Sequence, residues 1–362
     1  MTIKVGSTPE SANHMSAPRR RASKVDTIRH AYGFDDVSLA PGPTTVEPAD
    51  VDTSVAFAGL SLEIPVLAAS MDAVVDVRSA GVLAGLGGLA VMNLEGVQMR
   101  YEDPTPVLER IATAGPDRAQ EVLSAAYEAP VTEAIVAARI GELHEAGSPA
   151  VISATPAAAR RWGPFCAEAG ADAFLVQSQV SSAQHLASGY EPLELAEFTR
   201  LMGIPVAAGN TTSYEAAAAL MEQGIAALFV GVGPGAACTT REVLGIGVPQ
   251  VTAISDVAAA RDEHFERTGV YIPVVGDGGM RRGGEMAKAI AAGADLVMIG
   301  SPLARAEEAP GHGTNWGMAA PSPTLPRGTR IEVGTVGTME RILFGPSRVT
   351  DGTENLVGAL RQ

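Results

Sequence analysis

Residues 227–241 read ALFVGVGPGAACTTR, a short apolar run followed by a turn that holds three glycines, a proline and a cysteine. Glycine allows left-handed backbone conformations and the close approach of a ligand, which residues with a side chain resist. The stretch therefore predicts a strand, a tight turn and the start of a helix, with Cys238 presented at the turn. By itself it is equally compatible with an ordinary strand-to-helix loop that contains an incidental cysteine.

The same unit recurs along most of the chain. From residue 64 onward, short apolar runs alternate with alanine-rich helical patterns, as in 213–223 and 284–292, which end at Gly224 and Gly293. Strands that alternate with helices indicate a parallel sheet, and eight units over about 240 residues fit a (β/α)8 TIM barrel of the α/β class. A doubly wound open sheet is the alternative, but its phosphate-binding loop usually follows the first strand, whereas here the glycine-rich turns come late. The expected strands are 64–68, 88–92, 150–153, 173–176, 204–208, 227–230, 272–275 and 296–299.

The remaining segments frame this repeat. Residues 1–30 are polar and basic and are expected to form a flexible N-terminal arm, with His14-Met15 consistent with an engineered junction. Residues 31–362 are expected to form one catalytic domain, in which 32–39 is an N-terminal cap and 301–335 a long C-terminal loop rich in proline and glycine. A loop of that length in a compact domain normally serves function. The longest gap between strands, 93–148, leaves no room for an inserted domain because it reads as the helices 106–114, 117–127 and 131–146.

Composition and charge narrow the classes of function. The 362 residues are 46% hydrophobic but only 4% aromatic, and 40 are glycine, as in α/β proteins whose strands are buried on both faces. The net charge of −15 argues against nucleic acid and anionic membranes as partners, but not against a phosphorylated small molecule held by backbone amides. No apolar run reaches the ~18 residues that span a bilayer. Because Cys166 and Cys238 accompany no secretory pattern, a reducing, cytoplasmic location is expected.

Polar residues and glycines follow nearly every predicted strand, whereas the strand starts carry only turn chemistry. In a barrel the carboxyl ends of all strands meet at one face, so this asymmetry predicts one large site there. The turns Asp277-Gly278-Gly279 and Gly300-Ser301 follow the last two strands, where barrels often bind phosphate through backbone N–H groups. Asp277 would then be free to accept hydrogen bonds from ribose hydroxyls. Turns that merely need glycine and an aspartate cap are the plain alternative.

Cys238 is the candidate nucleophile of this site. A thiolate attacks electron-poor carbon, and the hydroxyl of Thr240, two residues on, can pass a proton to a leaving group or to water. A buried structural cysteine is the alternative, and it is the preferred interpretation of Cys166. The sequence has no Cys-x-x-Cys and no histidine pair at ligand spacing, so a transition-metal site is not expected.

These motifs together resemble the IMP dehydrogenase/GMP reductase family, which is built on a (β/α)8 barrel. The cysteine loop 231–241, continued by 245–254, is similar to the family's catalytic loop nearly residue for residue. The resemblance extends over about residues 30–362. Further matching motifs are Phe34-Asp35-Asp36-Val37, Ser70-Met71-Asp72, Ala208-Gly209-Asn210, Asp277-Gly278-Gly279, 287–295, Gly300-Ser301, 308–311 and Trp316-Gly317-Met318.

The resemblance implies covalent chemistry on a purine nucleotide, GMP or IMP. Cys238 would attack C2 of the purine with Thr240 as its proton relay, and a nicotinamide cofactor would exchange hydride at that carbon. The implied nucleotide-binding residues are Ser70, Met71, Asn210, Gly235, Asp277, Gly278, Gly279, Gly300, Ser301, Gly317 and Met318.

The resemblance also implies a cofactor, a cation and an assembly. In dehydrogenases of the family, loop carbonyls line a monovalent-cation site, and the matching carbonyls here are those of Gly233, Gly235 and Cys238, for K⁺. A homotetramer is implied as well. The nicotinamide of NADPH, or of NAD in a dehydrogenase, would lie beside Gln177, Ser178, Gly231 and Gly233.

Two features of the sequence favour a reductase over a dehydrogenase. Dehydrogenases usually carry tandem regulatory CBS domains after the second strand, and the gap 93–148 leaves no room for them. They also activate water with a mobile flap that bears an Arg-Tyr pair, whereas residues 319–327 hold three prolines and no such pair. The chain is most similar to a bacterial paralogue group that lacks CBS domains, and the expected reaction is the NADPH-dependent deamination of GMP to IMP and ammonia. An IMP dehydrogenase that forms XMP with NAD, and a non-catalytic purine-nucleotide-binding paralogue, are the alternatives.

Several positions depart from the family pattern. Ala236 stands where the cysteine loop has a phosphate-binding serine, and Asn315 where a tyrosine precedes the Gly-Met pair. Gln177 stands where dehydrogenases have an aspartate. The Thr–Glu relay of reductases lacks its glutamate because that site reads Arg327-Gly328-Thr329, and Glu308 is the nearest acidic candidate to replace it.

Overall fold

The computed structural model describes residues 28–115, 117–317 and 329–362. The chain divides into two compact units, Met1–Ala31 and Tyr32–Gln362, and every element named below belongs to the second. The flexible arm expected at 1–30 lies almost wholly outside the described residues and stays a prediction.

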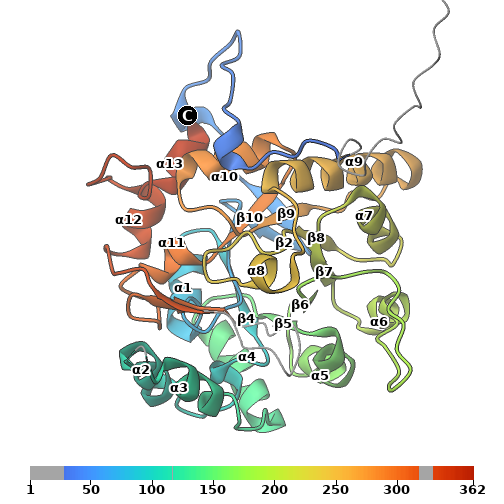
Figure 1. Ribbon diagram of the computed structural model, residues 1–362, viewed down its shortest axis with the longest axis vertical. Helices are drawn as coiled ribbons and strands as arrows, with labels where there is room; N and C mark the ends of the chain where they lie inside the picture. Colours follow the sequence, from blue (N-terminus) through green and yellow to red (C-terminus); the bar gives the residue numbers. More distant parts are fainter. Residues whose placement is uncertain (1–27, 116, 318–328) are drawn as a thin grey trace, which may run out of the picture. The chain divides into compact units, whose positions relative to one another are not determined.

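The second unit is built on a closed barrel of eight parallel strands surrounded by helices (Figure 1). The strands follow one another in chain order, and β10 closes the circle by pairing with β3. All eight predicted strands are present, so the predicted (β/α)8 barrel is confirmed and the open sheet is excluded. The strands are β3 (Val66–Ala68), β4 (Leu89–Asn93), β5 (Val151–Ala154), β6 (Ala173–Gln177), β7 (Val206–Thr211), β8 (Ala227–Val230), β9 (Val274–Asp277) and β10 (Leu296–Ile299).

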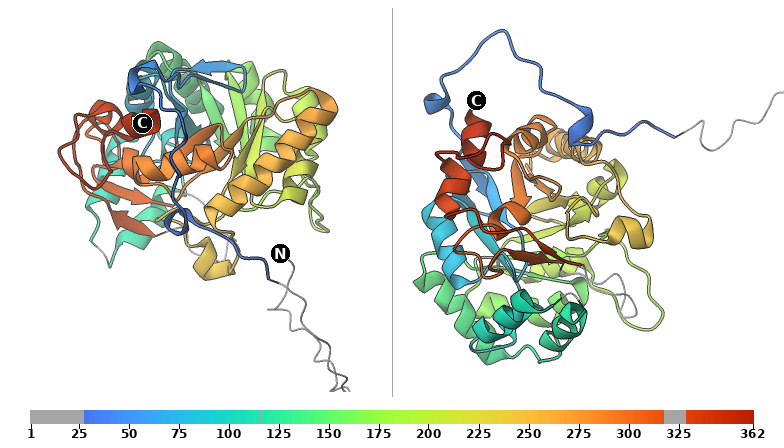
Figure 2. Two further views of the ribbon diagram at one scale, coloured as in Figure 1. Left: turned by 90° about the horizontal axis from the view of Figure 1, so that it is seen from above. Right: turned by 60° about the vertical axis from the view of Figure 1, so that its left-hand side comes forward.

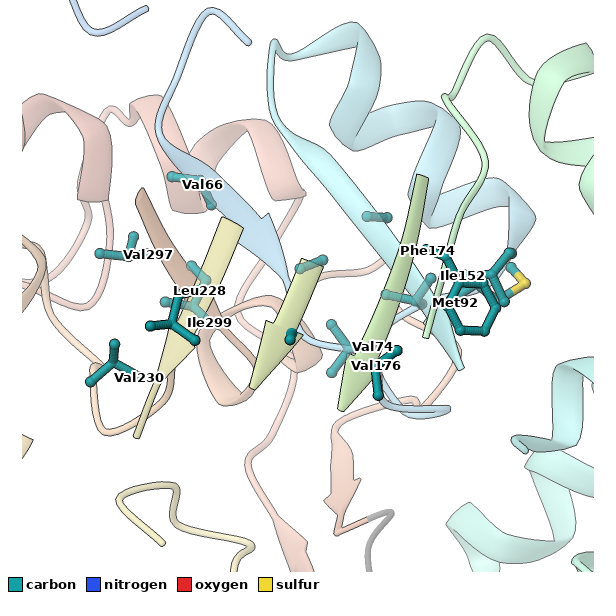
Figure 3. Packing of buried hydrophobic residues seen from close by; sticks show 14 of the residues in the cluster. Val66, Val74, Met92, Ile152, Phe174, Val176, Leu228, Val230, Val297 and Ile299 are labelled. Atoms are coloured by element: carbon teal, nitrogen blue, oxygen red, sulfur yellow. The ribbon is translucent and has the colours of Figure 1, made fainter. Parts of the chain in front are cut away.

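Alternating side chains of these strands build two hydrophobic cores. Leu67, Val91 and Leu175 belong to an inner cluster that fills the barrel together with Phe229 and Met298. Their neighbours along the strands belong to an outer cluster shared with the helices (Figure 3). Because both faces are buried, each strand is a continuous apolar run, which is why the sequence pattern located all eight. The outward-facing strand residues labelled in Figure 3 are Val66, Met92, Ile152, Phe174, Val176, Leu228, Val230, Val297 and Ile299.

Helices that follow the strands form the outer layer, and several begin at a side-chain cap. Asp76 accepts a hydrogen bond from the amide of Ser79 at 2.7 Å, and Thr155 and Ser213 cap their helices in the same way. The three helices expected between the second and third strands are confirmed as α2, α3 and α4. Among the described residues, no helix is both long and apolar enough to cross a membrane. The helices are α1 (Val77–Gly85), α2 (Thr105–Thr113), α3 (Ala119–Ala126), α4 (Glu133–Glu145), α5 (Pro156–Glu168), α6 (Leu195–Leu201), α7 (Tyr214–Met221), α8 (Thr240–Leu244), α9 (Gln250–Thr268), α10 (Gly283–Ala291), α11 (Ser301–Ala304), α12 (Met339–Phe344) and α13 (Leu356–Arg361).

An antiparallel hairpin of β1 (Val55–Phe57) and β2 (Leu60–Leu62) closes the N-terminal end of the barrel. Phe57 is fully buried and meets Phe229 of β8 edge-to-face, with the ring centroids 6.1 Å apart. The left view of Figure 2 shows this hairpin and α8 at opposite ends of the barrel. The hairpin therefore seals one end and leaves the carboxyl ends of the strands as the face on which a site can form.

The N-terminal cap expected at 32–39 runs along α9 and α10. The amide of Tyr32 donates to Thr252 Oγ1 at 2.8 Å, and the amide of Thr252 donates back to the Tyr32 carbonyl at 3.2 Å. Lys288 of α10 donates to the carbonyl of Phe34 at 2.8 Å, and the Phe34 ring is buried in the outer core. This anchoring explains why so short a segment is ordered.

The long C-terminal loop expected at 301–335 contains more regular structure than predicted. It begins with α11, and β11 (Thr314–Trp316) pairs antiparallel with β12 (Arg330–Glu332). Trp316 is fully buried against α2 and α3, and its indole N–H donates to the hydroxyl of Tyr127 at 3.0 Å. Tyr127 lies 189 residues away in the sequence. A local pattern of proline and glycine cannot show partners at that separation.

Candidate active site

Four polar side chains meet at the carboxyl ends of β3, β6, β7 and β9. The amide nitrogen of Gln177 donates to Asn210 Oδ1 at 3.1 Å and to Asp277 Oδ2 at 3.0 Å. The amide nitrogen of Asn210 donates to the same Asp277 oxygen at 2.7 Å. Ser70, just beyond β3, donates its hydroxyl to the Gln177 oxygen at 2.9 Å. The structure thus brings four of the predicted site residues into one hydrogen-bonded cluster.

Asp277 is the acidic centre of this cluster. Burial raises the pKa of Asp277 to about 6, while hydrogen bonds from Asn210 and Gln177 act in the opposite direction. The groups that favour its ionised form are therefore neutral amides. Both donate to Oδ2, which leaves Oδ1 as the carboxylate oxygen for a ligand hydroxyl.

Cys238 lies half-buried in the turn between β8 and α8, with its Sγ 3.1 Å from Oγ1 of Thr240. Thr240 begins α8 and is almost fully buried. The turn packs against the Gly278-Gly279 backbone, because a Cβ atom on Gly279 would come within 3.0 Å of Pro234. The nucleophile and hydroxyl predicted from the sequence therefore lie beside the predicted phosphate turn.

Gln250, the first residue of α9, links the two strands that carry these groups. Its amide nitrogen donates to the carbonyl of Val230 at 2.8 Å and to the carbonyl of Asp277 at 3.2 Å. A Cβ atom on Gly231 would come within 2.2 Å of that Asp277 carbonyl, so only glycine fits where the cysteine loop leaves β8. Gln250 belongs to the family-like stretch 245–254, but its role could not be predicted, because its partners are backbone carbonyls, which every residue has.

Arg241 holds the cysteine loop in place from its other end. Its guanidinium donates to the carbonyls of Val232 at 3.1 Å and Val248 at 2.8 Å. Replacing Arg241 with methionine keeps the aliphatic stem but leaves both carbonyls without this donor, so the turn should loosen. We expect iodoacetamide to alkylate Cys238 about threefold to tenfold faster in this variant, measured by mass spectrometry of the peptide. Arg267→Met, at an arginine whose side chain is 55% exposed, is the control, and an unchanged alkylation rate in Arg241→Met would contradict the assigned role.

The turn after β10 lies beside Met71. A Cβ atom on Gly300 would come within 3.1 Å of Met71 Sδ, so the sulfur packs against the Gly300 backbone at the start of α11. The hydroxyl of Ser301 accepts a hydrogen bond from the side-chain amide nitrogen of Asn315 at 3.1 Å. Asn315 is 1% exposed, and its side-chain oxygen has no partner among the described residues. Met71, Gly300 and Ser301, all predicted to bind substrate, therefore form a second group of neighbours at the same face.

The barrel agrees with the comparison to known proteins. The family model described as IMP dehydrogenase / GMP reductase domain matches residues 31–318. The chain belongs to the IMP dehydrogenase/GMP reductase family.

Full-length relatives are consistent with this family membership. An uncharacterized oxidoreductase of Mycobacterium tuberculosis is 39% identical over 345 residues, which cover 93% of this chain and 92% of the relative. The inosine-5′-monophosphate dehydrogenase of Methanocaldococcus jannaschii is 30% identical, with 80% of this chain and 74% of the relative covered. The crystal structure of an IMP dehydrogenase/GMP reductase-like protein from Corynebacterium glutamicum gives a TM-score of 0.85 at 33% identity, with 92% and 89% of the two chains covered.

Other residues that the family resemblance singled out make contacts outside the strand-end cluster. The carboxylate of Glu308 accepts a hydrogen bond from the amide of Met339 at 2.9 Å, at the start of α12. This hydrogen bond gives Glu308 a structural role at the start of α12, which a role as the replacement relay would disturb. Ser178 donates its hydroxyl within the loop that follows β6. Gly317 follows β11 and is half-buried, and Met318 lies outside the described residues.

The expected absence of a transition-metal centre and the expected K⁺ site concern different ligands. Among the described residues, no group of histidine, cysteine, aspartate and glutamate could hold a metal ion. K⁺ would instead use carbonyls of the cysteine loop. One of these, that of Gly235, already accepts from the amide of Cys238 at 3.0 Å. The K⁺ site stays a prediction.

A buried chain of polar groups that links the loop after β3 to β11 was not predicted. Asp72 is 2% exposed and accepts a hydrogen bond from the hydroxyl of Tyr127 at 2.7 Å. Burial raises the pKa of Asp72, and hydrogen bonds from the Val97 amide and Tyr127 lower it. Because Trp316 in turn donates to Tyr127, the chain fixes the end of β11 next to Gly317. The sequence signal was weak, since the segment that holds Tyr127 read only as helix.

Proposed function

We propose that this protein is a GMP reductase, which uses NADPH to convert GMP to IMP and ammonia. One observation carries the proposal: Cys238 Sγ and Thr240 Oγ1 lie 3.1 Å apart in a turn packed against Gly278-Gly279. A nucleophile, a proton-carrying hydroxyl and a glycine turn suited to phosphate lie side by side, as covalent chemistry on a nucleotide base requires.

The proposed reaction balances as GMP, NADPH and two protons giving IMP, NADP⁺ and ammonium. The thiolate of Cys238 adds to C2 of the purine, and the bond from C2 to the exocyclic nitrogen breaks as Thr240 passes a proton to the leaving ammonia. When bound, NADPH supplies the hydride that C2 receives. The bond between C2 and Sγ then breaks, and the electron pair returns to the thiolate. Asp277 would hold the ribose throughout by accepting a hydrogen bond from a ribose hydroxyl.

The sequence supports this direction over dehydrogenation of IMP. A dehydrogenase must hydrolyse its covalent intermediate, which by family resemblance calls for the Arg-Tyr flap. Residues 319–327 contain three prolines and no Arg-Tyr pair. Release of ammonia followed by hydride transfer needs no activated water, so a chain without that pair retains what the reductase reaction requires.

A purine-nucleotide-binding protein without turnover is the second candidate. It is favoured by the buried oxygen of Asn315, which has no partner in the described part of the chain, and by the contact that Glu308 makes to α12. We rank it below the reductase, because a binding protein has no need of the Cys238–Thr240 pair.

Product analysis separates these candidates. The protein is incubated with GMP and NADPH, and the mixture is separated chromatographically with a parallel assay for ammonium. The reductase predicts equal amounts of IMP, NADP⁺ and ammonium that grow with time. Tight GMP binding without any product would support the binding protein and contradict the reductase.

A further inference from the structure

Every polar atom of the Gln177 side chain has a partner within the strand-end cluster. Its oxygen accepts from Ser70, and its nitrogen has two hydrogens, which go to Asn210 and Asp277. Both side-chain amide hydrogens of Asn210 are also donated, one to Asp277 and one to the carbonyl of Gly231 at 2.8 Å. The cluster therefore contains four amide hydrogens and an acceptor for each of them.

The orientation of the Gln177 amide follows from these partners. Turning the amide over would set its oxygen against Asn210 Oδ1 and Asp277 Oδ2, so that acceptors would face each other. The observed orientation places a donor on the partly buried Asp277 carboxylate, whose charged form burial disfavours. The Gln177 oxygen keeps a second lone pair, but neither amide hydrogen could be donated to a nicotinamide without breaking a bond of the cluster.

We propose that Gln177 is a positioning residue for Asp277, which it holds with Oδ1 directed to a ribose hydroxyl, and that it does not bind the nicotinamide. The inference rests on the proposed function, because it assumes that a purine ribonucleotide occupies this face. It reassigns Gln177 from the cofactor side of the site to the substrate side. An aspartate at this position, as the dehydrogenases have, could not act in this way, since two carboxylates would repel each other.

The experiment measures how the effect of a Gln177 variant depends on the ribose hydroxyls. Affinities for GMP and for 2′,3′-dideoxy-GMP are determined by calorimetry for the parent protein and for Gln177→Met, which keeps the length of the side chain and removes its polar atoms. We expect the parent to prefer GMP by about tenfold or more, because a hydrogen bond to a carboxylate is involved. In Gln177→Met the preference should fall toward one, mainly through weaker binding of GMP.

Kinetics provide the second readout. The KM for GMP should rise about tenfold in Gln177→Met, while the KM for NADPH stays within about twofold of the parent value. Gln177→Glu keeps an acceptor for Ser70 but cannot donate to Asp277, so it should behave like the methionine variant. The control is Gln223→Met, at a glutamine that bonds the carbonyl of Ala219 and precedes the amino end of β8, opposite the carboxyl ends that carry the cluster.

The outcomes separate this inference from the proposed function. Unchanged preference for GMP in both Gln177 variants, or a rise in the KM for NADPH alone, would overturn the positioning role and leave the reductase standing. If the parent protein binds neither nucleotide, the proposed function falls and this inference with it. Melting curves verify that each variant is folded before its affinities are compared.

Discussion

Replacing Cys238 with alanine is expected to lower kcat for GMP reduction by roughly 10³- to 10⁶-fold, the range in which loss of a covalent nucleophile falls. In the proposed mechanism Sγ forms the bond to C2, and the hydroxyl of Thr240, 3.1 Å away, cannot replace it because an unactivated hydroxyl is a weak nucleophile. Affinity for GMP should change by no more than about threefold, because the proposed ribose and phosphate contacts lie on other strands. Turnover is measured by the loss of reduced-nicotinamide absorbance, and affinity by calorimetry.

The other cysteine supplies a matched control for this prediction. Cys166 is fully buried in α5, and burial raises the pKa of its thiol to about 12. Cys166→Ala should therefore keep full activity and lose only some stability. Intact-mass spectrometry of the parent protein during turnover should show a purine adduct that Cys238→Ala lacks. Undiminished turnover in Cys238→Ala would contradict covalent catalysis by this cysteine.

Replacing Asp277 with asparagine is expected to weaken GMP binding by about 100-fold and to reduce its dependence on pH between about 5 and 7 to the part that comes from the GMP phosphate. The amide oxygen of the new side chain can still accept from Gln177 and Asn210, so the cluster is kept while the charge is lost. In the parent protein the carboxylate takes up a proton below about pH 6, where its pKa lies. GMP affinity of the parent should therefore fall as pH falls through about 6.

The same pKa predicts an effect on stability. Between the ordinary aspartate value of 3.8 and about 6, the folded protein holds the Asp277 proton more tightly than the unfolded chain does. The contribution of this group to stability therefore declines as pH rises through that window. Asp277→Asn should accordingly melt a few degrees higher than the parent protein at neutral pH. Asp50→Asn, at an exposed aspartate, is the control, and a lower melting temperature with unchanged GMP affinity in Asp277→Asn would contradict both expectations.

The barrel could be predicted from the sequence because each strand is a short apolar run followed by polar or glycine residues. The hairpin that closes its N-terminal end could not. Each of its strands has three residues, and the turn uses Ala58 and Gly59, with φ of 47° and 82°, in place of the usual asparagine or aspartate before glycine. The β11–β12 pair escaped notice because each strand has only three residues and because Tyr127, the buried partner of Trp316, is 189 residues away.

The candidate site was likewise predictable only in part. Cys238, Thr240 and Asp277 could be named because their types and their places after strands suggest chemistry. Arg241 could not be assigned a role, because its partners are carbonyl groups that the sequence does not distinguish. The direction in which Gln177 points depends on donors and acceptors from three other strands, and only the folded chain brings these together.

The direction of the reaction is the central claim, and a pair of assays tests it most directly. One cuvette holds the protein with GMP and NADPH, the other holds it with IMP and NAD⁺, and the absorbance of reduced nicotinamide is followed in both. The account predicts a loss of absorbance in the first cuvette, with IMP and ammonium as products, and no change in the second. A rise in absorbance in the second cuvette with formation of XMP, and none of the expected loss in the first, would contradict it.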